Sequence, residues 1–140
     1  MRWIWIDKFV EFTPRTSATA VKNVSLAEEH LHDLYPAYPI VPHSLIVEGM
    51  AQTAGILVLR GIPDRDNKLV FLVSVDAARF RKPVVPGDQL RIEMKVIRRK
   101  GTVAKMAGTA TVNGVLVAEA EVMCKLEDKV PFAAAPQEVS

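Results

Sequence analysis

The residues best suited to acid–base chemistry are one glutamate and three histidines in the first half of the chain. Glu48 stands among apolar residues in the stretch 44–60, where a carboxyl group is costly to bury unless it is paired or protonated. A carboxyl group held in this way can exchange a proton with a substrate. His30, His32 and His43 precede it. From residue type and position alone, such a glutamate is more often a paired structural group, and acid–base chemistry at Glu48 is the alternative.

His43 is the histidine best placed to act as a base. It comes directly before Ser44, which can cap a helix. Its imidazole would then lie at the positive end of a helix dipole, where the neutral, proton-accepting form is favoured. Its alternative role is to fill space in a loop. His32 is a weaker candidate, and His30 is expected to face solvent.

Length and composition limit the class of protein. A chain of 140 residues with 49% apolar and 24% charged residues is expected to form one globular domain. Its one cysteine, Cys124, can form neither an internal disulfide nor a zinc site by itself, and is expected to be a small core residue. The sequence contains no glycine-rich phosphate loop, zinc-ligand spacing or nucleophile elbow, so we expect no metal and no cofactor.

The distribution of charge and hydropathy predicts a cytoplasmic protein without a membrane span. No run approaches the roughly 20 apolar residues that a membrane helix needs, and the N-terminus is charged too early for a signal peptide. A net charge of +2 gives no indication of nucleic-acid binding. Between residues 61 and 100, however, ten basic residues stand against five acidic ones. Six basic residues are predicted to attract an acidic partner, with a solvated surface as the alternative: Arg79, Arg81, Lys82, Arg98, Arg99 and Lys100.

The elements that would position the candidate site begin with two predicted strands. Residues 3–12 and 18–24 are rich in aromatic, β-branched and other strand-forming side chains. Ser25 and Glu28 match a capping box that opens a short helical turn. Three prolines in residues 34–42 exclude a helix and predict a stiff loop.

A single long helix is predicted directly after the proline loop. Ser44 can cap it, and it runs through Arg60. Gly61 and Pro63 supply the signals that end it. Its apolar residues cover most of its circumference, which is typical of a buried helix.

The remainder of the chain is predicted to form strands. Residues 68–75 are an apolar run typical of a strand buried on both faces, and residues 90–96 alternate between apolar and charged. Residues 103–112 form a third segment, followed by Asn113-Gly114, a strong hairpin signal. The next strand is predicted to place six residues on one face: Leu116, Ala118, Ala120, Val122, Cys124 and Leu126.

These elements together predict an α+β fold, in which a curved antiparallel sheet of about six strands wraps around one long central helix. Residues 1–130 are expected to form a single domain. Residues 131–140 contain small residues and two prolines and are expected to be a frayed tail. The helix is too short to cover the whole sheet, so two chains are expected to pair.

Two separated blocks resemble the signature of the FabZ-type 3-hydroxyacyl-acyl-carrier-protein dehydratases. The first, over residues 34–52, reads LYPAYPIVPHSLIVEGMAQ, and the second, over residues 78–90, reads ARFRKPVVPGDQL. The signature's prolines are retained as Pro36, Pro39 and Pro42, and two of its glycines are replaced by Ala37 and His43. The resemblance covers roughly residues 4 to 126. It implies a hotdog fold, a homodimer or trimer of dimers, an acyl carrier protein as partner and an acyl thioester as substrate.

The resemblance also implies a division of catalytic roles. In such enzymes a histidine at the start of the proline loop removes the C2 proton, and a helix glutamate from the other subunit acts on the departing 3-hydroxyl group. Glu48 matches that glutamate, whereas Leu34 occupies the histidine position and cannot accept a proton. A backbone N–H near His43 and Ser44 would polarise the thioester carbonyl. The resemblance implies four substrate contacts: Leu34, Tyr35, Pro42 and Ser44.

Three hypotheses about function remain open at this point. The first is a FabZ-like dehydratase with an altered base, for which His43 is the candidate. The second is a non-catalytic acyl carrier, or a partner subunit that lends Glu48 to a heterodimer with a histidine-bearing homologue. The third is an acyl thioesterase in which Glu48 activates water.

Overall fold

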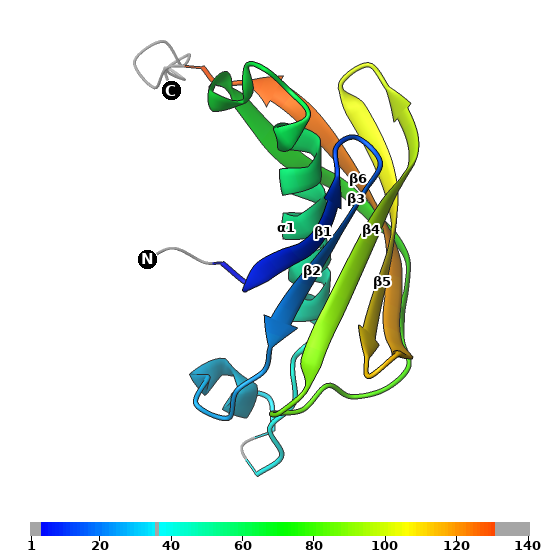
Figure 1. Ribbon diagram of the computed structural model, residues 1–140. Helices are drawn as coiled ribbons and strands as arrows, with labels where there is room; N and C mark the ends of the chain where they lie inside the picture. The colour runs from blue at the N-terminus through cyan, green and yellow to red at the C-terminus, as the bar shows by residue number, and fades with distance from the viewer. Residues whose placement is uncertain (1–3, 36, 131–140) are drawn as a thin grey trace.

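One curved antiparallel sheet and one long helix make up the fold (Figure 1). The computed structural model describes residues 4–35 and 37–130. The predictions for Trp3, Pro36 and the tail 131–140 lie outside these residues. Within them, the sheet order is β1-β2-β4-β5-β6-β3. The elements are β1 (Lys8–Thr13), β2 (Ser17–Asn23), α1 (His43–Arg60), β3 (Lys68–Phe80), β4 (Gln89–Lys100), β5 (Val103–Val112) and β6 (Val115–Asp128), with short 3-10 turns at Glu29–His32 and Arg65–Asn67.

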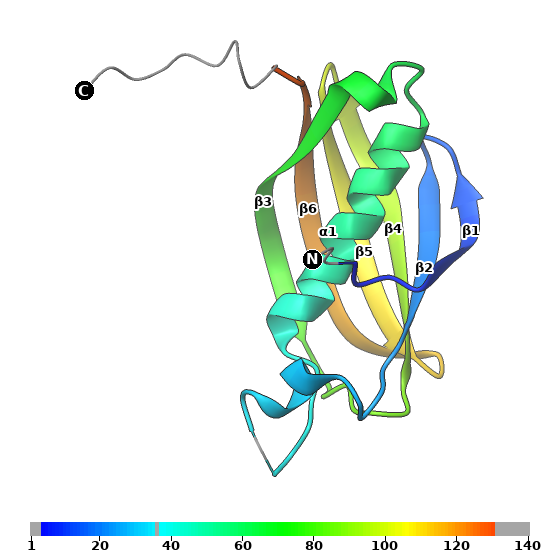
Figure 2. The same cartoon turned by 90° about the vertical axis from the view of Figure 1, so that its left-hand side faces the viewer.

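The helix crosses the concave face of the sheet (Figure 2). The predicted α+β architecture, with six strands wrapped around one helix, is therefore confirmed. No helix in the described part of the chain is both long and apolar enough to cross a membrane.

Strand alternation and turn chemistry build the β4–β5–β6 meander. Leu90, Ile92 and Met94 are fully buried, while the intervening side chains point to the outer face, as the period of two predicts. Asn113 and Gly114 adopt φ angles of 50° and 79°, which the tight turn between β5 and β6 requires. The predicted hairpin is confirmed.

The predicted apolar face of β6 is correct from Ala118 onward and wrong at its start. Ala110 pairs with Ala118 but Thr111 pairs with Leu116, so Val117 is an extra residue in a β-bulge. The bulge buries Val117 and leaves Leu116 only half-buried, which strict alternation cannot anticipate.

The long helix begins two residues earlier than predicted. Its N-cap is Pro42, whose carbonyl accepts the backbone N–H of Leu45 at 2.9 Å. Ser44 is the second residue of the helix and not its N-cap, so its predicted capping role is wrong. Gly61 ends the helix as predicted.

Only one face of α1 is fully buried within this chain. The buried residues are Ile46, Gly49, Met50, Thr53, Ala54, Leu57 and Val58. The opposite face is half-buried. The prediction of a helix buried on all sides is therefore confirmed for one face alone, and the other face is available to line a site.

Gly49 is required where α1 packs on the sheet. A Cβ atom at this position would lie 2.6 Å from Ile92 Cδ1 and 3.1 Å from Trp5 Cδ1. We expect Gly49→Ala to destabilise the fold by about 1–2 kcal/mol. Overpacking costs about 1–3 kcal/mol, and the higher helix propensity of alanine offsets up to about 1 kcal/mol of this. Urea unfolding measures this change. Gly55→Ala is the control, since a Cβ there meets nothing nearer than 3.9 Å, and an equal effect at both positions would contradict the packing role.

The N-terminal strand starts later than the aromatic pattern predicts. β1 begins at Lys8, and Trp5 lies ahead of it in the core, 3% exposed. The Trp5 backbone N–H donates to Gln52 Oε1 of the helix at 2.8 Å instead of joining the sheet ladder. The segment before β1 is thereby tied to the half-buried side of α1.

His30 does not face solvent as predicted. Its ring packs edge-on against Trp5, with centroids 4.8 Å apart, and its Nε2 lies 3.4 Å from Glu28 Oε2. The predicted capping box is half formed. Ser25 N–H donates to Glu28 Oε1 at 3.0 Å, whereas Ser25 Oγ accepts from Ala27 N–H at 3.2 Å.

Strand β3 lies at an edge of the sheet, which corrects the prediction that it is buried on both faces. Among the described residues it pairs with β6 alone. Five of its apolar side chains are 36–53% exposed: Leu69, Phe71, Leu72, Val73 and Val75. A long apolar edge strand is a template for pairing with another chain. The apolar run therefore predicts the strand, but this chain alone does not bury it.

Candidate active site

Glu48 lines a cavity of about 470 Å³ between the half-buried face of α1 and the edge strand β3. The α1 residues that line it follow helical spacing: Glu48, Ala51, Gln52, Gly55, Ile56 and Leu59. Val70 and Leu72 of β3, Cys124 of β6 and Ile4 complete the wall. Apart from Glu48 and Gln52 the lining is apolar. The cavity can therefore hold an extended apolar group whose polar end meets a carboxyl group.

Gln52 holds the Glu48 carboxyl group in place. Its Nε2 donates to Glu48 Oε1 at 2.8 Å, one helical turn away. Its Oε1 accepts the backbone N–H of Trp5, and because a main-chain N–H can only donate, this bond fixes which end of the amide faces Glu48. Gln52 is not among the residues predicted from the sequence, although its spacing of four residues from Glu48 on a helix is a usable signal.

Cys124 borders the same cavity with a buried thiol. Burial raises the pKa of its thiol, so the sulfur carries its proton at neutral pH. Its side chain is 2% exposed, and the prediction of a small core residue is confirmed.

A second hollow, of about 290 Å³, lies at the N-terminal end of α1. Leu34, Tyr35, Ile40, Pro42, His43 and Ser44 line it. The four residues predicted to contact the substrate thus lie together, beside the candidate base. The His43 ring stacks flat on Phe80 of β3, with centroids 4.1 Å apart and an interplanar angle of 3°. The first N–H groups of a helix lack intrahelical acceptors, so this hollow has the features of an oxyanion site.

The candidate acid and base do not meet within one chain. Glu48 lines the cavity beside β3, whereas His43 lines the hollow at the helix start. Five residues of α-helix turn the two side chains about 140° apart around the axis. Within one chain, the two groups therefore do not face a common cavity.

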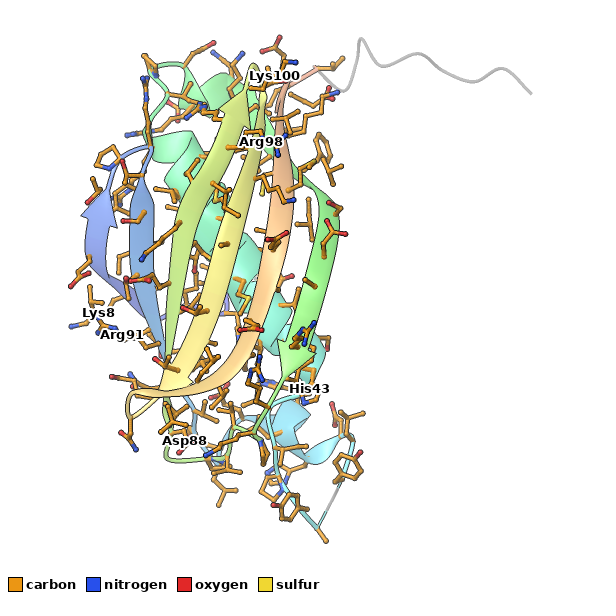
Figure 3. The ribbon with its side chains drawn as sticks, turned by 90° about the vertical axis from the view of Figure 1, so that its right-hand side faces the viewer. Lys8, His43, Asp88, Arg91, Arg98 and Lys100 are labelled. Atoms are coloured by element: carbon orange, nitrogen blue, oxygen red, sulfur yellow. The ribbon has the colours of Figure 1, made fainter. Side chains whose placement is uncertain are left out.

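The six basic residues predicted to attract an acidic partner lie in two separate groups. Arg79, Arg81 and Lys82 are at the end of β3, next to Phe80 and His43, and Arg81 Nη2 lies 2.8 Å from Glu119 Oε1. The other three end β4: Arg98, Arg99 and Lys100. Figure 3 shows Arg98 and Lys100 at one end of the sheet and His43 at the other. Strand β4 has 12 residues and spans about 36 Å from its first residue to its last. This length separates the two basic groups.

The second basic group borders a different hollow, on the outer face of the sheet. Arg98 and Lys100 line it together with Val103, Lys105 and Met123, and its volume is about 340 Å³. It lies on the opposite side of the sheet from α1 and Glu48. Among the described residues no group of three or more metal-ligating side chains occurs.

Solved structures with this arrangement define the class of fold as hotdog. The hot-dog-like protein from Thermanaerovibrio acidaminovorans matches with a TM-score of 0.70 at 19% identity, over 84% of this chain and 85% of that chain. The dehydratase heterocomplex ApeI:P from Xenorhabdus doucetiae matches with a TM-score of 0.71 at 15% identity, over 90% and 84% of the two chains. The predicted hotdog fold is confirmed.

Sequence comparison gives the family. The FabA-like domain matches residues 4–121, and the chain belongs to this family. It is 58% identical over 128 residues to the 3-hydroxyacyl-[acyl-carrier-protein] dehydratase FabZ of Solibacter usitatus, covering 91% of this chain and 78% of that protein. It is 43% identical over 132 residues to the FabZ of Koribacter versatilis, covering 94% and 83%. The resemblance to FabZ-type dehydratases is thereby confirmed.

Proposed function

We propose that this protein dehydrates 3-hydroxyacyl thioesters carried by an acyl carrier protein. The observation that carries the proposal is Glu48, held by Gln52 at one end of an otherwise apolar cavity in a chain of the FabA-like family. In the reaction a base removes a proton from C2, and the C2–H electron pair forms the C2=C3 double bond. The C3–O bond breaks, and the oxygen takes the Glu48 proton and leaves as water. Protonation is needed because hydroxide is a poor leaving group.

The hollow at the start of α1 would supply the catalytic base, the N–H donors for the thioester oxygen and contacts to the substrate. The backbone N–H groups near His43 and Ser44 would bind the thioester oxygen, where negative charge develops as the C2 proton leaves. His43 is the candidate base, because its ring borders this hollow and its stacking on Phe80 fixes the ring plane. Leu34 and Tyr35 would contact the substrate near the thioester.

The active unit would be a dimer joined along β3. The exposed apolar edge strand offers unpaired backbone groups and side chains that pairing would bury. Val70 and Leu72 of the same strand line the Glu48 cavity, so a second subunit placed there would also border the cavity. It could then present its own Leu34, Tyr35 and His43 to Glu48.

The acyl carrier protein would dock on the first basic group. Arg79 and Lys82 make no ion pair among the described residues, and they flank the strand end where Phe80 meets His43. The group at Arg98, Arg99 and Lys100 lies at the far end of the sheet, so it is the weaker candidate for delivering a thioester.

Steering by exposed charges weakens as ionic strength rises, and KM for a carrier-linked substrate is therefore expected to increase with salt.

One observation favours a second candidate function, that of a partner subunit. Leu34 is 59% exposed and lines the hollow in the position where the resemblance implies a histidine. Such a chain could lend Glu48 to a histidine-bearing homologue and contribute no base of its own.

A direct assay separates these functions. The purified protein is incubated with a 3-hydroxyacyl thioester of acyl carrier protein, and both the enoyl product and free thiol are measured. Enoyl product from the protein alone supports the dehydratase. Product only after addition of a histidine-bearing homologue supports the partner subunit, and release of thiol without enoyl product supports a thioesterase.

Replacing Gln52 by methionine is expected to lower kcat for dehydration by about 10- to 100-fold. Methionine matches the size of glutamine but cannot donate to the Glu48 carboxylate that forms as the proton is transferred, and a hydrogen bond to a charged group contributes about 1.5–3 kcal/mol. The same change removes the acceptor of the Trp5 N–H, so limited proteolysis near the N-terminus is expected to accelerate. Gln89→Met on β4 is the matched control. A Gln52 variant with unchanged kcat would exclude the positioning role.

A further inference from the structure

The cavity face of α1 contains a glycine at the point where a long acyl chain would pass. Gly55 follows Glu48 by seven residues, two helical turns, which places it about 10 Å further along the helix axis. Both residues line the same cavity, with Ile56 and Leu59 beyond. A chain that starts at Glu48 and follows the apolar wall therefore reaches Gly55 after its first several methylene groups.

Helix stability does not account for this glycine. Glycine in a helix interior is less favourable than alanine, because it loses more backbone freedom on folding. Packing within the chain does not account for it either. A Cβ atom at Gly55 would meet only Val70 Cγ1, at an ordinary contact distance of 3.9 Å. Gly49 on the opposite face differs, since its Cβ would overlap Ile92 at 2.6 Å.

We propose that Gly55 keeps the cavity deep enough for medium- and long-chain acyl groups, and so determines the chain length of the substrate. This inference rests on the proposed function and names its substrate class. A side chain at position 55 would point into the space between α1 and β3, opposite Val70. It would stop a long chain there and leave room near Glu48 for a short one.

The decisive variant is Gly55→Leu, compared with the wild-type protein on two substrates. With a 3-hydroxydodecanoyl thioester, kcat/KM is expected to fall about 50-fold or more, because each excluded methylene costs about fourfold in binding and at least three would be excluded. With a 3-hydroxybutyryl thioester, kcat/KM is expected to stay within about threefold. Gly55→Ala serves as a graded control with a smaller loss on the long substrate alone.

A competing explanation is that Gly55 permits close contact between subunits. The oligomeric state of Gly55→Leu is therefore measured by sedimentation. An altered assembly, or an equal loss on both substrates, would overturn the proposal in favour of packing.

Binding separates failure of this inference from failure of the proposed reaction. If the wild-type protein dehydrates neither substrate, calorimetry with dodecanoyl and butyryl pantetheine thioesters tests the cavity directly. Selective loss of dodecanoyl binding in Gly55→Leu supports the chain-length role even though the dehydratase proposal fails. Equal binding by both proteins, or no binding by the wild-type protein, refutes the chain-length role itself.

Discussion

Replacing Glu48 by glutamine is expected to reduce dehydration by a factor of about 10² to 10⁴ while leaving the fold intact. Glutamine keeps the shape of glutamate but has no acidic proton to give to the departing hydroxyl group, and a positioned general acid contributes rate factors of this size. The side chain lies toward the cavity and outside the buried core, so the substitution removes no packing. The loss is expected in kcat, measured by formation of the enoyl thioester.

A matched control comes from the outer face of the sheet. Glu93 on β4 is also half-buried, and its Oε1 lies 3.4 Å from Lys95 Nζ. Glu93→Gln makes the same chemical change far from the cavity and is expected to leave kcat unchanged. If Glu48→Gln and Glu93→Gln retain equal activity, Glu48 is not the acid.

The parts of the fold that depend on local patterns could be predicted from the sequence. The alternation over residues 90–96 defines β4, and Asn113-Gly114 defines the hairpin that follows β5. The proline-rich loop fixes where α1 begins to within two residues. These features depend on neighbouring residues alone, so one sequence suffices to predict them.

Features that depend on strand order could not be predicted in this way. An apolar run such as residues 68–75 is compatible with a strand in the middle of a sheet and with an edge strand that another chain could cover. Only the pairing of β3 with β6 places it at the edge. The two basic groups belong to one positively charged stretch of the sequence. The residue pattern does not show that β4 runs back along the sheet and carries Arg98 away from Arg81.

The candidate site is predicted better in its acid and base than in the groups that support them. The resemblance predicts Glu48 as the acid and places the acid and the base on different subunits, and within one chain the helix does carry Glu48 and His43 into separate hollows. Gln52 was missed because its role depends on Trp5, which is 47 residues distant in the chain and meets it only through tertiary structure.

Replacing Leu34 by histidine is expected to raise dehydratase activity by a factor of about 10² or more. Leu34 is 59% exposed and borders the hollow at the start of α1, so an imidazole fits there without disturbing the core. A positioned general base contributes about 10²–10⁴ to the rate. The base must be neutral to accept the C2 proton, and histidine has an ordinary pKa of about 6.5. The gained activity should therefore rise with pH through that region.

The gain must depend on the imidazole as a proton acceptor. Leu34→Asn introduces a polar side chain that cannot act as a base, and it is expected to show no gain over the wild-type rate. Combining Leu34→His with His43→Gln then identifies the native base. If His43→Gln alone abolishes activity and the double variant recovers it, His43 is the base that Leu34→His replaces. If the wild-type protein is inactive and Leu34→His is active with or without His43, the wild-type chain has an intact acid and lacks a base, as expected of a partner subunit. No gain in Leu34→His, with the fold intact by circular dichroism, would show that this hollow is not where the C2 proton is removed.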